Sequence, residues 1–236
     1  MAVRRARKFR CQGKLEREAR ASGFAVVAGA DEAGRGSLFG PVFAAAVVLD
    51  PKRPIYGLRD SKELFAAERE RLAGEIRERA MAWAVAPVDA FVIDRINIYQ
   101  ASCLAMTRAI AQLSPPPDYL LLDAVRLDLE LPQQRVVHGD QKCQAIAAAS
   151  ILAKVHSDAA IREWDRIYPW YGLSENKGYA TRDHLEALAV RGPSLQHRFS
   201  YEPVRAACPR SYRAVLALRE SLHFRWEPQL WEGAGA

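Results

Sequence analysis

Short apolar segments of strand length alternate along this chain with longer segments that have the residue spacing of helices. The apolar runs predict five strands, at residues 25–30, 42–49, 83–88, 119–122 and 134–137. The remaining pattern predicts helices that begin at Asp60 (with Glu63 as its capping partner), span 89–113, follow Asp140, span 181–190 and span about 210–223. This alternation indicates an α/β fold, in which helices cover the faces of a mixed sheet. A run of small residues, 145–153, lets the helix after Asp140 pack closely on that sheet.

Acidic side chains stand at three of the predicted strand ends. Asp31 and Glu32 follow the first strand, Asp123 ends the fourth, and Asp140 comes just after the fifth. Converging carboxylates repel one another, and divalent cations relieve that repulsion. Hard oxygen ligands select Mg²⁺ or Mn²⁺, and no set of His and Cys residues competes here for a softer ion. Each acid alone also suits a turn or a helix cap, so spacing by itself does not decide whether the four converge.

The net charge of +6 is located in residues 1–22, because the rest of the chain has equal numbers of basic and acidic residues. A basic arm favours polyanions such as nucleic acids, and a solvated tail is the alternative interpretation. The arm lacks the apolar centre of a secretory signal, although an Arg-rich start also resembles a mitochondrial presequence. No apolar run is long enough to span a bilayer, so we expect no membrane association.

The four cysteines, Cys11, Cys103, Cys143 and Cys208, form no C-x-x-C pair. Neither a zinc site nor a redox motif is therefore indicated. Free thiols in a reducing compartment are the simplest account, and we expect a cytoplasmic protein.

One segment, DEAGRGSLFGP at residues 31–41, resembles the signature of bacterial ribonuclease HII. Further segments resemble that family in the same order: Asp60-Ser61-Lys62, residues 96–101, Leu122-Asp123, Gly139-Asp140, residues 146–155, residues 176–179 and His197-Arg198. The resemblance covers roughly residues 24–205.

The resemblance implies a ribonuclease H-like fold with a mixed five-stranded sheet and a helical C-terminal extension. It divides the chain into a basic arm (1–22), a catalytic domain (23–205) and the extension (206–236). It also implies an endonuclease that cleaves the RNA strand of RNA–DNA hybrids and nicks duplex DNA on the 5′ side of single embedded ribonucleotides. Two Mg²⁺ or Mn²⁺ ions would drive an in-line displacement that leaves 5′-phosphate and 3′-hydroxyl ends.

Site residues follow from the matching motifs. Asp31, Glu32, Asp123 and Asp140 correspond to the catalytic, metal-binding acids. Gly34, Arg35 and Gly36 would form the loop that senses the ribonucleotide 2′-OH, where only glycines allow the backbone to approach a sugar closely. Tyr179 would stack on the following deoxyribose, and Lys62 would contact a phosphate.

We expect a monomer that binds RNA–DNA hybrid and ribonucleotide-containing duplex DNA. The segment Gln229-Leu230-Trp231 faintly resembles a peptide that binds a replication clamp, which would make the clamp a further partner.

The chain departs from the family pattern at four places. Ala124 stands where Gly often follows the third acid, and Cys143 stands where a Ser hydroxyl could contact a phosphate. The sequence His156-Ser157-Asp158 replaces a common Arg-Asp, which predicts the loss of a salt bridge on the helix surface. Phe199 stands where a second Arg is common.

Two other functions compete with this interpretation. One is a different nuclease of the same broad fold, such as a recombinase-type or junction-cutting enzyme, against which the ordered motifs argue. The other is a non-catalytic nucleic-acid-binding module, which would suit the basic arm but gives no role to four acids.

Overall fold

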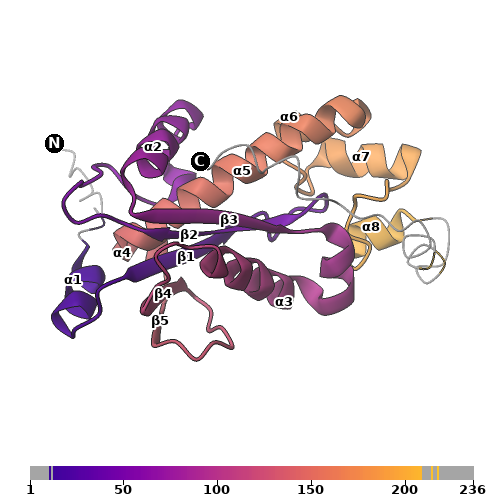
Figure 1. Ribbon diagram of the computed structural model, residues 1–236. Helices are drawn as coiled ribbons and strands as arrows, with labels where there is room; N and C mark the ends of the chain where they lie inside the picture. Colours follow the sequence, from indigo (N-terminus) through magenta and orange to yellow (C-terminus); the bar gives the residue numbers. More distant parts are fainter. Residues whose placement is uncertain (1–10, 12, 209–213, 215–216, 218–236) are drawn as a thin grey trace, which may run out of the picture.

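The computed structural model describes residues 11, 13–208, 214 and 217 and contains a five-stranded mixed sheet (Figure 1). Its strands are β1 (Val27–Ala33), β2 (Val42–Val48), β3 (Ala82–Val88), β4 (Tyr119–Asp123) and β5 (Gln133–Val136). They lie in the order β3-β2-β1-β4-β5. The first three strands pair antiparallel, and β4 and β5 extend the sheet from β1 in parallel. The predicted strands and the α/β class are therefore confirmed.

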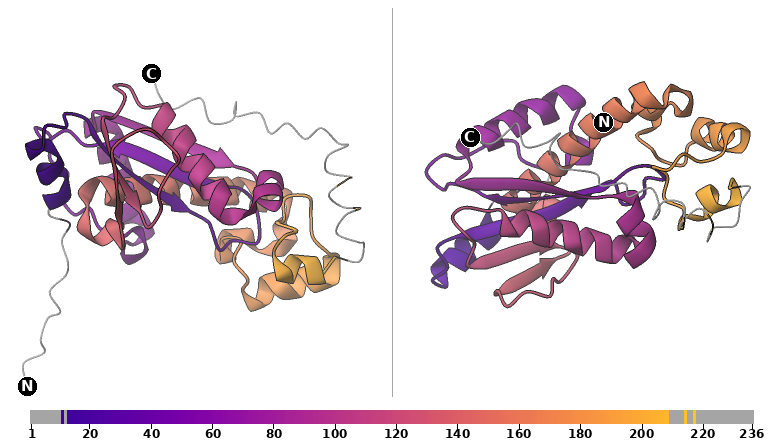
Figure 2. Two further views of the ribbon diagram at one scale, coloured as in Figure 1. Left: turned by 90° about the horizontal axis from the view of Figure 1, so that it is seen from below. Right: turned by 45° about the vertical axis from the view of Figure 1, so that its right-hand side comes forward.

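Helices cover both faces of this sheet, as Figures 1 and 2 show from several sides. The described elements are α1 (Lys14–Ala21), η1 (Ser61–Glu63), α2 (Ala66–Arg79), α3 (Ala90–Ala111), α4 (Gly139–Lys142), α5 (Gln144–Ile167), η2 (Pro169–Tyr171), α6 (Leu173–Asn176), α7 (Arg182–Arg191) and α8 (Glu202–Ala206). Helix α3 packs on one face, and α2 and α5 pack on the other. The predicted helices at 89–113 and 181–190 correspond to α3 and α7.

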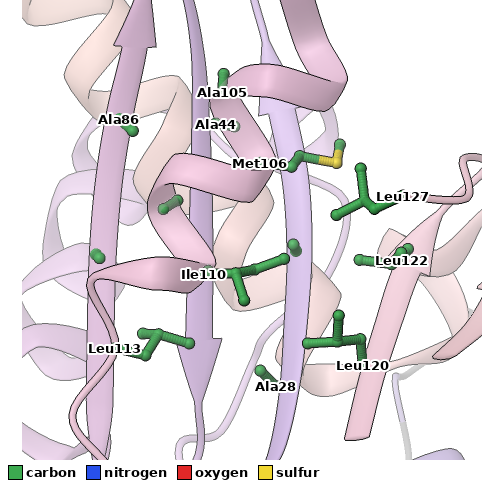
Figure 3. Packing of buried hydrophobic residues seen from close by; sticks show 14 of the residues in the cluster. Ala28, Ala44, Ala86, Ala105, Met106, Ile110, Leu113, Leu120, Leu122 and Leu127 are labelled. Carbon is green, nitrogen blue, oxygen red and sulfur yellow. The ribbon is translucent and has the colours of Figure 1, made fainter. Parts of the chain in front are cut away.

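Small side chains on the central strands let the helices approach the sheet. Every residue of β2 is buried, since this strand lies in the interior of the sheet with both faces covered. Figure 3 shows Met106 and Ile110 of α3 over Ala44 of β2 and Leu122 of β4. Such packing fixes the sheet as a rigid base for its strand ends.

Helix α5 approaches the sheet closely at Gly29 of β1. A Cβ atom at this position would lie 2.3 Å from the backbone carbonyl carbon of Ala145, so that only glycine fits there. The small residues 147–149 of α5 are fully buried, which confirms the close packing predicted for this helix. The start of α5 is thereby held beside the amino-terminal half of β1.

The helix predicted to begin at Asp60 does not begin there, whereas the long helix predicted to follow Asp140 is confirmed. Asp60 begins only the short η1, where its carboxylate accepts the Lys62 N–H at 2.9 Å, and the extended backbone of Leu64 delays α2 until Ala66. The long helix predicted after Asp140 begins at Gln144, because Cys143 is extended and separates it from α4. Asp140 lies within α4 and is not a helix cap.

Predictions for the C-terminal end fall almost wholly outside the described residues. These are the helix at about 210–223, of which residues 214 and 217 are described, and the segment 229–231. Within the described part of the chain, no helix has the length and apolar character needed to cross a membrane. All four cysteines are free thiols, as predicted.

Candidate functional site

The sheet brings three of the four acids to one edge. Asp31 and Glu32 lie near the carboxyl end of β1, and Asp123 is the final residue of β4. Because Ala30 pairs with Leu122 in parallel register, Asp31 and Asp123 stand at the same level of neighbouring strands. Side chains of adjacent parallel strands in register point to the same face.

Asp123 connects this edge to the fourth acid. Its Oδ1 atom accepts the backbone N–H of Gly139 at 2.7 Å. Gly139 begins α4 and directly precedes Asp140, so the end of β4 and the turn that carries Asp140 are tied together.

The charges of the acids act on one another. Burial, followed by the charges of Glu32 and Asp123, raises the pKa of Asp31 well above its ordinary value. Burial, followed by the charges of Asp60 and Asp123, raises the pKa of Asp140 to about 6. Asp31, Glu32, Asp123 and Asp140 are thus brought together, and Asp60 joins them.

Glu32 also has a raised pKa, and Arg35 provides a positive charge beside it. Burial raises the pKa of Glu32, the adjacent Arg35 opposes the rise, and Asp123 and Lys62 act in opposite directions more weakly. The Arg35 Nη1 atom donates to Glu32 Oε1 at 3.1 Å. The other carboxylate oxygen, Oε2, is buried and has no hydrogen-bond partner among the described residues.

These donors suit a hard divalent cation. A buried, unpartnered carboxylate oxygen and several carboxyls with raised pKa values are relieved when a cation neutralises the group. Nevertheless, the described residues contain no set of three or more His, Cys, Asp or Glu side chains already gathered as a finished metal site. Oxygens of Asp31, Glu32 and Asp123 are instead engaged with the Glu32 N–H, Arg35 and the Gly139 N–H.

The loop after β1 places two glycines and an exposed arginine beside the acids. Gly34 has φ +90°, a conformation that favours glycine. Arg35 is exposed, and its backbone carbonyl accepts hydrogen bonds from the side chains of Arg198 and Tyr201. The backbone of the loop is therefore held from within the protein.

Arg198 is the main support of this loop, and sequence reasoning gave it no role. Its side chain is fully buried, donating from Nη1 to Arg35 O at 2.8 Å and from Nε to Gly40 O at 2.9 Å. Asp94 accepts the next two backbone N–H groups, those of residues 199 and 200, and so fixes the segment that carries the arginine. The His197-Arg198 match was the only sequence signal for this contact.

Tyr179 lies against the same loop. The residue is 41% exposed, and a Cβ atom on Gly36 would lie 3.3 Å from Tyr179 Cε1. Asn176 shapes the preceding turn, since its side chain accepts the Gly178 N–H at 2.7 Å and donates to Tyr171 O at 2.6 Å. The structure thus brings the predicted loop and the predicted aromatic residue together.

Lys62 is exposed in η1, and its charge favours ionisation of both Glu32 and Asp140. A chain of hydroxyls connects its loop to the acids: Ser61 Oγ lies 2.9 Å from Ser150 Oγ, and a hydrogen bond from Ser150 favours ionised Asp31. Lys62 therefore stands at the margin of the acidic group.

Two of the four departures have other consequences than predicted. Cys143 is fully buried, with its thiol directed at Glu16, so it is out of reach of a substrate phosphate. Asp158 does form salt bridges, to Lys154 at 2.6 Å and to Arg69 at 3.7 Å, so the predicted loss is wrong.

The other two departures are structural. Ala124 has φ +52°, a conformation in which an L-residue with a Cβ is strained. Phe199 is buried in a cluster with Leu38 and Phe39, where a second arginine would have to be desolvated.

Comparisons with known proteins identify related sequences and structures. The family model described as Ribonuclease HII matches residues 28–204. Ribonuclease HII from Solibacter usitatus is 59% identical over 199 residues, which cover 84% of this chain and 87% of that protein.

Solved structures also match the fold. Ribonuclease H2 from Pyrococcus horikoshii superposes with a TM-score of 0.69 and 26% identity, covering 80% of this chain and 99% of that one. Ribonuclease HII from Archaeoglobus fulgidus, solved in complex with PCNA, superposes with a TM-score of 0.64 and 27% identity, covering 75% of this chain and 96% of that one.

Proposed function

The chain belongs to the ribonuclease HII family and is a ribonuclease H, and from that premise we propose that it hydrolyses the RNA strand of RNA–DNA hybrids and also nicks duplex DNA on the 5′ side of a single ribonucleotide. The products carry 5′-phosphate and 3′-hydroxyl ends. The observation that supports this most is that Asp31 and Asp123 lie at the same level of neighbouring strands, with Asp123 hydrogen-bonded to the turn that carries Asp140.

The acids hold the cations. Asp31, Glu32, Asp123 and Asp140 supply hard oxygen donors that suit two Mg²⁺ or Mn²⁺ ions. When bound, the two ions activate a water molecule and stabilise the leaving 3′-oxygen. Burial of Asp31 and Asp140 keeps bulk water from competing for their charges. The Oε2 atom of Glu32, which is buried and has no hydrogen-bond partner among the described residues, is an oxygen ligand that need not lose a hydration shell to bind a cation.

The loop and Tyr179 read the sugar. The backbone of residues 34–36 approaches the ribose, where the 2′-OH is the group that distinguishes RNA from DNA. Tyr179 stacks on the next deoxyribose, so that the site recognises the RNA-to-DNA junction. Arg35 and Lys62, both exposed near the acids, contact phosphates of the cleaved strand.

Four substrates test this function: a uniform RNA–DNA hybrid, a DNA duplex with one ribonucleotide, an all-DNA duplex and a four-way DNA junction. With Mg²⁺, we expect cleavage of the first two and of neither DNA substrate, and EDTA should abolish it. Cleavage of the junction would indicate a different nuclease of the same fold. Binding without cleavage, unaffected by Asp31→Asn, would indicate a non-catalytic module.

Several further proposals are supported by the sequence alone. They are a monomeric state, a cytoplasmic location, an arm at 1–22 and an extension at 206–236. A contact between residues 229–231 and a replication clamp is a further proposal, supported by the Archaeoglobus fulgidus relative that was solved with PCNA. Loss of clamp binding after truncation at residue 228 would test it.

A further inference from the structure

The N-terminal segment folds back onto the turn that carries Asp140. The Cys11 thiol donates a hydrogen bond to the backbone carbonyl of Asp140 at 3.1 Å. In return, Gln144 Nε2 donates to the backbone carbonyl of Cys11 at 3.0 Å. Part of the predicted basic arm is therefore packed against the body of the protein.

Glu16 forms the centre of this contact. It lies in α1 and is only 4% exposed. Its Oε1 atom accepts the backbone N–H of Ala145 at 2.8 Å and the thiol of Cys143 at 3.2 Å. The Ala145 N–H belongs to the first turn of α5 and has no partner within the helix, so Glu16 acts as a cap supplied from a distant segment. A negative charge at a helix N-terminus is also favoured by the helix dipole.

Both thiols in this contact are donors at neutral pH. Burial, followed by the charges of Glu16 and Asp140, raises the pKa of Cys11 to about 12. Burial and Glu16 likewise raise the pKa of Cys143 well above its ordinary value. Each thiol is thus protonated and can donate to the oxygen that it faces.

The corner between α4 and α5 depends on such external support. Cys143 is extended, with φ −122° and ψ 125°, so the backbone is not continuous helix between Asp140 and α5. From inside, Asp123 holds Gly139. From outside, Cys11 and Glu16 hold the carbonyl of Asp140 and the start of α5.

We propose that Glu16 is a positioning residue for Asp140, which fixes the α4–α5 corner and thereby raises the affinity of the acidic site for divalent cations. The inference rests on the proposed function, because it takes Asp140 to be a cation ligand. Groups that orient metal ligands typically change metal affinity by about 10-fold to 100-fold when removed.

Calorimetric titration of the full chain with Mn²⁺ tests the proposal without any substrate cleavage. Glu16→Ala should weaken Mn²⁺ binding by at least about 10-fold. Glu16→Gln keeps an acceptor oxygen in the same place and should stay within about 3-fold of the parent chain. Glu18→Ala is the matched control, since Glu18 lies on the same helix but is exposed and forms an ion pair with Lys14 at 3.5 Å, and it should leave binding unchanged.

Asp140→Asn separates failure of this inference from failure of the proposed function. Loss of Mn²⁺ binding in Asp140→Asn with normal binding in Glu16→Ala would refute the positioning role alone. Normal binding in both would refute Asp140 as a cation ligand, and with it both this inference and the four-acid assignment of the proposed function. If Glu16→Ala does not fold, Cys11→Ala provides the decision, because it removes the hydrogen bond to the Asp140 carbonyl and should weaken binding about 2-fold to 5-fold. Unchanged binding in that variant would overturn the proposal.

Discussion

Asp140→Asn should stabilise the metal-free protein while abolishing cleavage. Asp140 is only 9% exposed, and burial together with the charges of Asp60 and Asp123 raises its pKa from 3.8 to about 6. A carboxyl with a raised pKa destabilises the folded state when it is ionised. Asparagine has nearly the same shape and carries no charge, so it removes this cost.

The pKa difference sets the size of the effect. One pKa unit corresponds to about 1.36 kcal/mol, so a rise in the pKa of Asp140 from 3.8 to about 6 corresponds to about 3 kcal/mol of folding free energy at neutral pH. Solvent screening at the edge of the site reduces this value, so we expect a gain in unfolding free energy of about 1–3 kcal/mol.

The pH dependence follows from the same values. The folded state binds the Asp140 proton more tightly than the unfolded state, so this stabilising contribution is full below pH 3.8 and is lost as pH rises through about 6. The variant should therefore lose less stability than the parent chain as pH rises through this range.

Urea unfolding in EDTA, at several pH values, measures these quantities. Asp128→Asn is a suitable control, because Asp128 is exposed and should give no change. Saturating Mn²⁺ should reverse the order of stability, since a ligand stabilises only the folded state that binds it. A metal-free variant that is less stable than the parent chain would refute this reasoning, as would cleavage at a normal rate.

Three further predictions concern the rest of the site. Tyr179→Ala should lower cleavage at a single ribonucleotide by at least about 10-fold and affect a uniform hybrid less, because only the junction requires stacking on a deoxyribose; equal losses in steady-state assays of both substrates would disprove this. Ala124→Gly should raise the unfolding free energy by about 0.5–1 kcal/mol, because φ +52° strains alanine more than the added freedom of glycine costs; a drop in urea midpoint would show that no strain is present. Arg198→Met should destabilise the protein by about 1–3 kcal/mol, since the Gly40 carbonyl loses its buried donor and the Arg35 carbonyl keeps only the Tyr201 hydroxyl among the described residues; an unchanged melting temperature would count against this support.

The sheet and its acidic edge could be predicted because their signals are local. Strand-length apolar runs give the strands, and acids at strand ends give the candidates Asp31, Glu32, Asp123 and Asp140. Their convergence depends on which strands are neighbours, and the parallel pairing of β1 with β4 is not a local property. The motif resemblance supplied what the periodicity did not.

The supporting contacts could not be predicted, because they join distant segments through single hydrogen bonds. Glu16 looks like one of several charged residues in a basic helix, although it caps α5 at a sequence distance of 129 residues. Arg198 has no repeating pattern around it. Cys143 was compared with a hydroxyl at the substrate, whereas its neighbours turn it into the interior.

The most direct test of the central claim is anomalous diffraction from crystals of the full chain grown with Mn²⁺ and a non-cleavable duplex that contains one ribonucleotide. We expect two manganese peaks among the carboxylates of Asp31, Glu32, Asp123 and Asp140, next to the phosphate on the 5′ side of the ribonucleotide. Peaks bound elsewhere, or a duplex seated away from these four side chains, would contradict it.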